Sequence, residues 1–165
     1  MTVRACAFTG HRASKLPWRY NENDPRCREL KQRIFDVVEA LYTAYGVRKF
    51  ICGMAEGCDM YFCESVLQLK EMRPDIILEA AIPFAGQADQ WPEHQRIRWA
   101  TLVEQCDEKT VLRQEYSHSC MMERNKYMVD HAQILVACYD GKSGGTLNTL
   151  RYAIKNGREI LQIQI

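Results

Sequence analysis

The sequence predicts an α/β fold, namely a Rossmann-like three-layer αβα sandwich with a mainly parallel sheet of about six strands. Two observations lead to this prediction. Short apolar runs alternate with longer amphipathic stretches along the whole chain, which is the pattern of βαβ units. The apolar runs also lack polar alternation, as expected for strands that are covered on both faces of their sheet. Because no linker, repeat or shift of composition divides the chain, we expect a single domain over residues 1–165.

The predicted strands are the short apolar runs. In chain order these are Val3–Phe8, Lys49–Cys52, Ile76–Ile82, Thr110–Leu112, Ile134–Tyr139 and Glu159–Ile165. Parallel neighbours in a sheet need crossover connections, and these connections are normally helical. Each amphipathic stretch between two runs is therefore expected to form a helix.

The first two helices have recognisable ends. Asp24 and Pro25 form an N-cap and first-turn pair, apolar residues follow at helical spacing, and Gly46 ends the pattern. The second helix is expected to begin with Asp59 as its cap and to end before Pro74.

The second half of the chain is expected to hold the remaining helices. Their ranges are about Pro92–Cys106, Cys120–His131 and Thr146–Asn156. In the last of them Leu147, Leu150 and Ile154 are expected to face the core, and Gly157 follows the end of the helix.

Charge and composition exclude several classes of protein. The chain has 22 basic and 21 acidic residues, a formal net charge of +1, so nothing sequence-wide indicates a nucleic-acid tail or a membrane-surface binder. No apolar run approaches the roughly 18 residues that a membrane helix needs, and the start of the chain shows no secretory signal. We therefore expect a soluble, cytoplasmic protein with no membrane partner. Its eight cysteines, with no CxxC pair among them, are expected to be free thiols.

Glycines gather where the strands are expected to end. Gly10 follows the first strand, Gly53 and Gly57 follow the second, and the pair Gly144 and Gly145 follows the fifth. Ligands of open α/β sheets bind at the carboxyl ends of the strands. Glycine lets a ligand approach the backbone there, and the first N–H groups of the next helix favour phosphate. These turns therefore predict a site for a nucleotide or another phosphorylated ligand.

Other residues near the same edge add suitable side chains. Arg12 can make paired hydrogen bonds to phosphate, His11 can donate or accept a proton near neutral pH, and Thr146 adds a hydroxyl. Phe84 and Trp91, in a long loop, are expected to flank a base. Neither the Walker spacing nor the GxGxxG fingerprint is present, so the usual NTPase and dehydrogenase readings lack their motifs.

The sequence gives less evidence for a metal site or a reactive cysteine than for a phosphate site. The histidines are scattered, and His118 with Cys120 supplies too few ligands for zinc, so no metal site is expected. Cys58 is the one candidate for a cysteine nucleophile, because it falls at an expected helix N-terminus, which lowers the pKa of a thiol. Packing in the core or the pocket wall is the alternative for Cys58.

Four motifs resemble those of one family in the same order. They are Phe8–Arg12, Gly53–Asp59, the Ile82–Phe84 segment with Gly86, Gln87 and Trp91, and the stretch from Glu123 to Thr146. Together they resemble the YpsA-like proteins, also called the DUF1273 family, of the SLOG superfamily, to which DprA and the LOG proteins also belong. The resemblance covers essentially the whole chain. It implies a pocket for a nucleotide or a nucleotide derivative, such as ADP-ribose or an NAD-related molecule. We expect no required cofactor.

The LOG enzymes allow a comparison residue by residue. They cleave the N-glycosidic bond of cytokinin nucleotides, and their pattern resembles M-x-x-R-K-x-x-M followed by P-G-G-x-G-T-x-x-E. This chain matches the pattern at Met121, Arg124, Met128, Gly144, Gly145 and Thr146. It departs from the pattern at Asn125, where the lysine would be, and at Thr149, where the catalytic glutamate would be.

The change at Thr149 bears on activity, because glycosidic cleavage needs a carboxylate to stabilise the oxocarbenium-like centre or to activate water. The resemblance therefore implies binding without LOG-type hydrolysis, unless Glu56, Asp59 or Asp140 supplies the acid from another turn. The leading hypothesis is a nucleotide-binding module with a sensing or regulatory role, with Asp140 and Arg124 among its ligand-binding residues. The second is a nucleotide N-glycoside (phosphoribosyl) hydrolase with a relocated acid, for which Glu56, Asp59 and Arg124 are the catalytic candidates.

A nucleic acid is not the expected partner. The segment Arg96–Trp99 mixes basic and aromatic residues, but no extended basic stripe accompanies it. DprA-like nucleic-acid binding is therefore the third hypothesis. Apolar surface on the last strand and helix is compatible with a homodimer.

Overall fold

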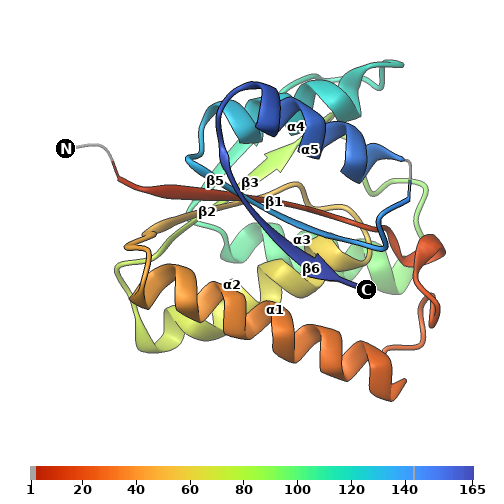
Figure 1. Cartoon of the computed structure of the whole chain (residues 1–165). Helices are drawn as coiled ribbons and strands as arrows, with labels where there is room; N and C mark the ends of the chain where they lie inside the picture. The colour runs from red at the N-terminus through yellow and green to blue at the C-terminus, as the bar shows by residue number, and fades with distance from the viewer. Residues whose placement is uncertain (1–2, 143) are drawn as a thin grey trace.

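The computed structural model describes residues 3–142 and 144–165, and it confirms the α/β fold: a six-stranded parallel sheet lies between two layers of helices (Figure 1). The strands are β1 (Ala5–Gly10), β2 (Lys49–Cys52), β3 (Ile77–Ile82), β4 (Glu108–Val111), β5 (Ile134–Tyr139) and β6 (Glu159–Gln164). Their order in the sheet is β4-β3-β2-β1-β5-β6, and every neighbouring pair is parallel.

Helices cover both faces of this sheet (Figure 1). The helices on one face are α1 (Pro25–Thr43), α2 (Cys58–Met72) and α3 (Glu93–Gln105), and those on the other face are α4 (Cys120–Asp130) and α5 (Gly145–Lys155). A short 3-10 helix, η1 (Ala13–Lys15), follows β1. Phe50 of β2 packs in the core beneath α1–α3 and its neighbour Ile51 packs beneath α4 and α5. Both faces of the strand are therefore apolar, as the missing polar alternation predicted.

The strand order reverses between β1 and β5. Strands β2, β3 and β4 follow one another on one side of β1. The connection through α4 then crosses back over the sheet, and β5 pairs with the other side of β1. A ligand crevice is expected where the order reverses, at the carboxyl ends of the two strands that part there. Phe8 of β1 stacks on Phe62 of α2 with ring centroids 4.5 Å apart, which holds the start of α2 beside this crevice.

Several boundaries differ from the predicted ones. The first strand ends at Gly10 and not at Phe8, because its pairing with β5 continues to the partners Gly10 and Cys138. The second helix is capped by Gly57 and not by Asp59, which lies in the first turn of α2. Ile154 is 59% exposed and does not face the core, because the inner face of α5 runs instead through Thr146, Thr149, Leu150 and Ala153.

The predicted start of α1 is confirmed. Asp24 caps the helix by accepting a hydrogen bond from the backbone N–H of Arg26 at 2.8 Å, and Pro25 occupies the first turn.

All eight cysteines are free, and seven of them are buried. No helix among the described residues is both long enough and apolar enough to cross a membrane.

Candidate functional site

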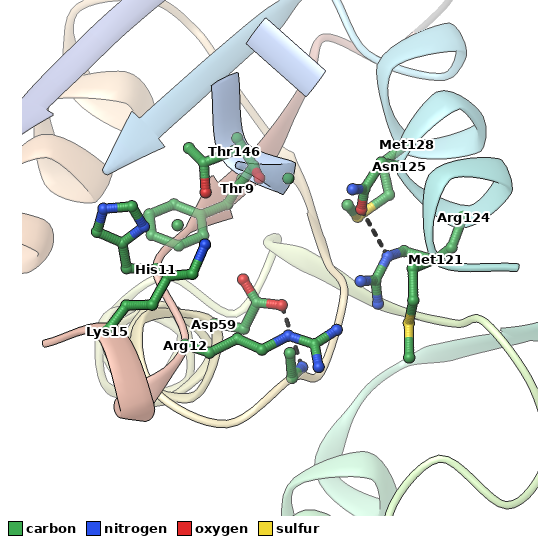
Figure 2. Close-up of a pocket in the computed structure, with 14 residues that line it drawn as sticks. Thr9, His11, Arg12, Lys15, Asp59, Met121, Arg124, Asn125, Met128 and Thr146 are labelled. Carbon is green, nitrogen blue, oxygen red and sulfur yellow. Dashed lines mark hydrogen bonds between the residues drawn. The ribbon is translucent and has the colours of Figure 1, made fainter. Parts of the chain in front are cut away.

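A cavity of about 360 Å³ opens at the carboxyl ends of the strands where the sheet order reverses. Its walls come from the end of β1 and η1, from the turn and first residues of α2, from α4 and from the start of α5 (Figure 2). The lining residues are Phe8, Thr9, Gly10, His11, Arg12, Lys15, Ala55, Asp59, Met121, Arg124, Asn125, Met128, Gly145 and Thr146.

Many of the predicted site residues meet in this cavity. Those that line it are Gly10, His11, Arg12, Asp59, Arg124, Gly145 and Thr146. Four others do not line it but adjoin residues that do: Gly53 accepts a hydrogen bond from Arg124, Asp140 is bonded to His11, and the backbones of Gly57 and Gly144 lie close to Arg12 and Lys15 respectively. Phe84, Trp91 and Glu56 lie outside it.

Arg124 is the buried cation of the site. Its side chain, on α4, is only 4% exposed. One guanidinium nitrogen, Nη1, donates to the carbonyl oxygen of Gly53, and Nε donates to Oδ1 of Asn125 at 2.8 Å. Burial lowers the pKa of the guanidinium, and the nearby Asp59 opposes that shift. Asn125 therefore orients Arg124 from the position where the LOG pattern has a lysine.

Asp59 is the buried acid of the site, with 6% of its surface exposed. Its Oδ2 accepts a hydrogen bond from the backbone N–H of Ala55 at 3.1 Å. Within residues 3–142 and 144–165 its carboxyl forms no ion pair at 4.0 Å or less. Burial raises the pKa of this carboxyl, while Arg124 and Arg12 act against the increase.

His11 joins the two strands that part at the crevice. Its Nε2 lies 3.0 Å from Oδ1 of Asp140 and 3.2 Å from the backbone nitrogen of the same residue. The hydrogen bond with His11 holds the pKa of the Asp140 carboxyl below its usual value. The backbone N–H of Lys142 donates to Asp140 as well, at 3.0 Å. Asp140 is thus engaged in fixing the turn after β5 to the end of β1.

Close approach of other atoms explains why positions 53 and 57 are glycine. A Cβ atom at Gly57, which has φ +90°, would lie 2.5 Å from the backbone nitrogen of Ala13. A Cβ atom at Gly53 would lie 2.7 Å from Nη1 of Arg124. At Gly145, in contrast, nothing lies within 4 Å of the position of a Cβ, so the backbone there faces open space.

The start of α5 forms the wall that suits an anion. Gly145 and Thr146 line the cavity at the first turn of the helix, where N–H groups have no carbonyl partner within the helix. Arg12 and Lys15 are both exposed, and Figure 2 shows the ammonium end of Lys15 reaching towards Thr146. Sequence reasoning missed Lys15. It lies three positions after Arg12, and in a 3-10 turn residues at this spacing lie on the same side. This spacing in the sequence could have indicated that Lys15 accompanies Arg12.

Sequence reasoning also left Asn125 unassigned in the site, and α4 shows why it belongs there. Met121, Arg124, Asn125 and Met128 all line the cavity, and their spacing places them on one face of the helix. The matched spacing of the LOG-like pattern therefore corresponds to one wall of the cavity.

The position of the LOG glutamate faces the core. Thr149 is fully buried, and its hydroxyl donates to the carbonyl oxygen of Gly145 at 2.9 Å within α5. Glu56 is held outside the cavity by Gln95, whose Nε2 donates to it at 2.9 Å, and by the hydroxyl of Tyr20 at 3.4 Å. Of the three acids proposed as substitutes, Asp59 is thus the one that lines the cavity.

The predicted aromatic walls lie elsewhere. Phe84 packs edge-on against Tyr116, with ring centroids 5.5 Å apart, in a separate cavity. Trp91 is partly buried against the core of α1–α3.

Cys58 is fully buried, and a hydrogen bond with Cys138 together with burial raises the pKa of its thiol, which opposes a role as nucleophile. The described residues contain no cluster of three or more His, Cys, Asp or Glu side chains able to hold a metal ion.

Known proteins resemble this chain in sequence and in fold. Over 144 residues it is 33% identical to the uncharacterized SPbeta prophage-derived protein YoqJ of Bacillus subtilis (strain 168), covering 80% of this chain and 84% of that protein. The fold is similar to that of DprA from Streptococcus pneumoniae, with a TM-score of 0.65 and 14% identity, and to that of DprA from Helicobacter pylori, with 0.62 and 16%. These matches cover 99% and 98% of this chain but span only 51% and 65% of the two DprA chains. Residues 6–165 match the YpsA family profile, and the chain therefore belongs to the YspA SLOG family.

Proposed function

We propose that this protein binds a nucleotide or a nucleotide-derived anion, of the ADP-ribose or NAD class, in the cavity at the carboxyl edge of its sheet. One observation carries the proposal: the first turn of α5 and the side chains of Arg12, Lys15 and Arg124 converge on a single cavity. An anion is the ligand that this combination favours, since helix N-termini and clustered cations both attract negative charge. A phosphate group is therefore the expected anchor of the ligand.

The overall charge of the chain agrees with a local cationic site. Three cations and one acid, Asp59, line the cavity, and the formal net charge of the chain is only +1, so most of the balancing acids lie outside the cavity. Charge gathered in a cleft acts more strongly than charge spread over a surface, because the walls exclude water and focus the field. The ligand would meet a positive cavity on an almost neutral molecule.

A role in sensing or regulation fits this site better than LOG-type hydrolysis. The residue at the LOG glutamate position, Thr149, is buried and bonded within its own helix, so it presents no carboxylate to the cavity. Binding that favours the native state stabilises it in proportion to ligand concentration. The protein can thus report the ligand through its own stability and conformation.

Ligand-dependent stabilisation tests the proposal. The melting temperature is measured with AMP, ADP, ADP-ribose, NAD and the parent nucleoside, and we expect the phosphorylated compounds alone to raise it. At a hundred times Kd the ligand should add about 2.7 kcal/mol to the free energy of unfolding. Arg12→Ala and Gly145→Asp should abolish the increase. Gly145→Asp is informative because the new side chain meets open space and an acid suits a helix N-terminus, so the fold is kept while phosphate is repelled. Arg151→Ala, which removes an exposed cation of α5 away from the cavity, is the matched control.

The proposal fails if none of these compounds changes the melting temperature, or if Gly145→Asp leaves the change intact. A single-stranded oligonucleotide belongs in the same panel, because the Helicobacter pylori DprA structure describes a single-stranded DNA binding mode. Tight, salt-sensitive binding of the oligonucleotide in place of the nucleotides would favour nucleic-acid binding.

One observation favours hydrolysis of a nucleotide N-glycosidic bond as a second candidate function. Asp59 is a buried acid in the cavity, and burial raises its pKa, which is the usual preparation of a carboxyl group for proton transfer. Release of free base from AMP, followed by chromatography, tests this function. It requires that Asp59→Asn abolish the release, and absence of any release from the panel of nucleotides rejects it.

A further inference from the structure

We infer that Asp59 recognises the sugar of the ligand by accepting hydrogen bonds from its hydroxyl groups, so that the cavity takes the ribose 5-phosphate part of a ribonucleotide. The inference rests on the proposed function and adds to it the chemical class of the part of the ligand that is bound most closely. It is carried by the hydrogen bonds of Asp59, by the charges around it and by its place across the cavity from α5.

The Asp59 carboxyl has a free acceptor inside the cavity. Asp59 is only 6% exposed, and it is one of the residues that line the cavity. Its Oδ2 is occupied by the N–H of Ala55, whereas Oδ1 has no hydrogen-bond partner among the described residues. Figure 2 shows this carboxyl directed into the cavity, between the side chains of η1 and those of α4. This oxygen is not fully buried and stays accessible from the cavity, so a ligand hydroxyl can bond to it in place of water.

The charges of the cavity decide which kind of donor fits. Arg12, Lys15 and Arg124 line the same space, so a ligand ammonium group beside Asp59 would be repelled by three cations. None of these cations forms an ion pair with Asp59 at 4.0 Å or less, which leaves its oxygen available. A neutral donor is therefore favoured, and a hydroxyl hydrogen-bonded to an ionised acceptor forms a strong bond of this type.

The arrangement of the walls joins the hydroxyls to a phosphate. Thr146 and the first turn of α5 lie on one side of the cavity, and Asp59 approaches from α2 on the other (Figure 2). The volume of about 360 Å³ is near the lower end of the range for small-molecule sites, about 300–1,000 Å³. A sugar phosphate fits such a volume. The base or a second phosphate of a larger nucleotide would extend towards the opening of the cavity. The predicted base neighbours Phe84 and Trp91 lie outside the cavity, in agreement with recognition that is centred on the sugar.

Comparison of ligands that differ in one hydroxyl tests the inference on the unmodified protein. Isothermal titration is carried out with ribose 5-phosphate, AMP, 2′-deoxy-AMP, 3′-deoxy-AMP and GMP. We expect ribose 5-phosphate to bind, AMP and GMP to bind alike, and loss of the hydroxyl that reaches Asp59 to weaken binding about tenfold or more. In Asp59→Asn the difference between AMP and its deoxy analogues should shrink to within about threefold, because the charged acceptor is lost. Asp36→Asn, an exposed acid of α1, is the matched control and should keep the full difference.

Each outcome separates this inference from the proposed function. Equal affinities for AMP and both deoxy analogues would overturn the role of the sugar and leave nucleotide binding standing. Discrimination that follows the base, with AMP and GMP far apart, would overturn it in favour of base recognition. A full preference for ribose in Asp59→Asn would show that another residue reads the hydroxyls. No binding of any of these ligands would contradict the proposed function itself.

Discussion

Two buried side chains of opposite charge, Asp59 and Arg124, line the same cavity without forming an ion pair within 4.0 Å. Burial shifts both towards their neutral forms, raising the pKa of Asp59 and lowering that of Arg124. A buried charge that lacks a direct partner lowers the stability of a protein, and such groups are concentrated at functional sites. The energetic cost of these two residues is consistent with a cavity that is completed by a ligand.

Asp59→Asn is expected to stabilise the free protein in a pH-dependent way. The pKa of Asp59 is above its ordinary value of 3.8 in the folded state, so the folded protein binds the proton more tightly than the unfolded chain does. Stability is therefore lost as the pH rises from the unfolded pKa through the folded one, by about 1.4 kcal/mol for each unit between the two values. Urea denaturation from about pH 4 to about pH 8 should show the advantage of Asp59→Asn over the unmodified protein growing with pH and then levelling off. A difference that stays constant over this range would contradict the raised pKa.

At the scale of the element, α5 serves the site and the core with different faces of one helix. Its first turn, with Gly145 and Thr146, lines the cavity. Thr149 and Leu150 face the sheet, and both are buried. Thr146 and Thr149 lie three residues apart in the LOG-like pattern. On the helix, the first meets the cavity and the second meets the core.

Restoring a glutamate at position 149 is therefore expected to damage the fold without creating a hydrolase. Thr149→Glu places a carboxylate at a fully buried site and should cost about 3 kcal/mol or more of unfolding free energy. Thr149→Val removes the hydroxyl bond to Gly145 at nearly the same volume and should cost only about 1 kcal/mol. Urea denaturation measures both, and chromatography follows free base from AMP. A stable Thr149→Glu protein that releases base would show that this position can reach the ligand.

At the scale of the whole molecule, one sheet holds together the two apolar layers and the cavity between their ends. Adjacent residues of each central strand pack into opposite layers, as Phe50 and Ile51 do, so neither layer can loosen without exposing the sheet. The cavity is built from both layers, with Asp59 from α2 on one face and Arg124 from α4 on the other. The site therefore depends on the integrity of the entire sandwich.

This dependence predicts one cooperative unfolding transition. The tryptophans Trp18, Trp91 and Trp99 all pack in or against the layer of α1–α3, so their fluorescence reports on that layer. Circular dichroism in the far ultraviolet reports on all of the helices. The two signals should give coincident urea curves, as in a two-state domain, and a ligand should shift both equally. Separate midpoints would instead show that the two layers unfold independently and that residues 1–165 are not a single cooperative domain.

The sequence by itself determined the fold class and the order of the elements. These features rest on local patterns: apolar runs form strands, and amphipathic stretches between them form helices. The sequence also contains the LOG-like spacing of Met121, Arg124 and Met128, but it did not show that these residues line one cavity. The family resemblance, which rests on those same motifs, was confirmed as well.

Only the tertiary structure decided which side chains share the cavity. Among the three candidate acids it selected Asp59, because Glu56 is drawn outward by Gln95 and Asp140 is bonded to His11. It added Lys15 and Asn125 to the lining and left Phe84 and Trp91 outside. The physical reason is that a residue's position at the end of a strand follows from local pattern, whereas the direction and partners of its side chain depend on how separate segments pack against one another.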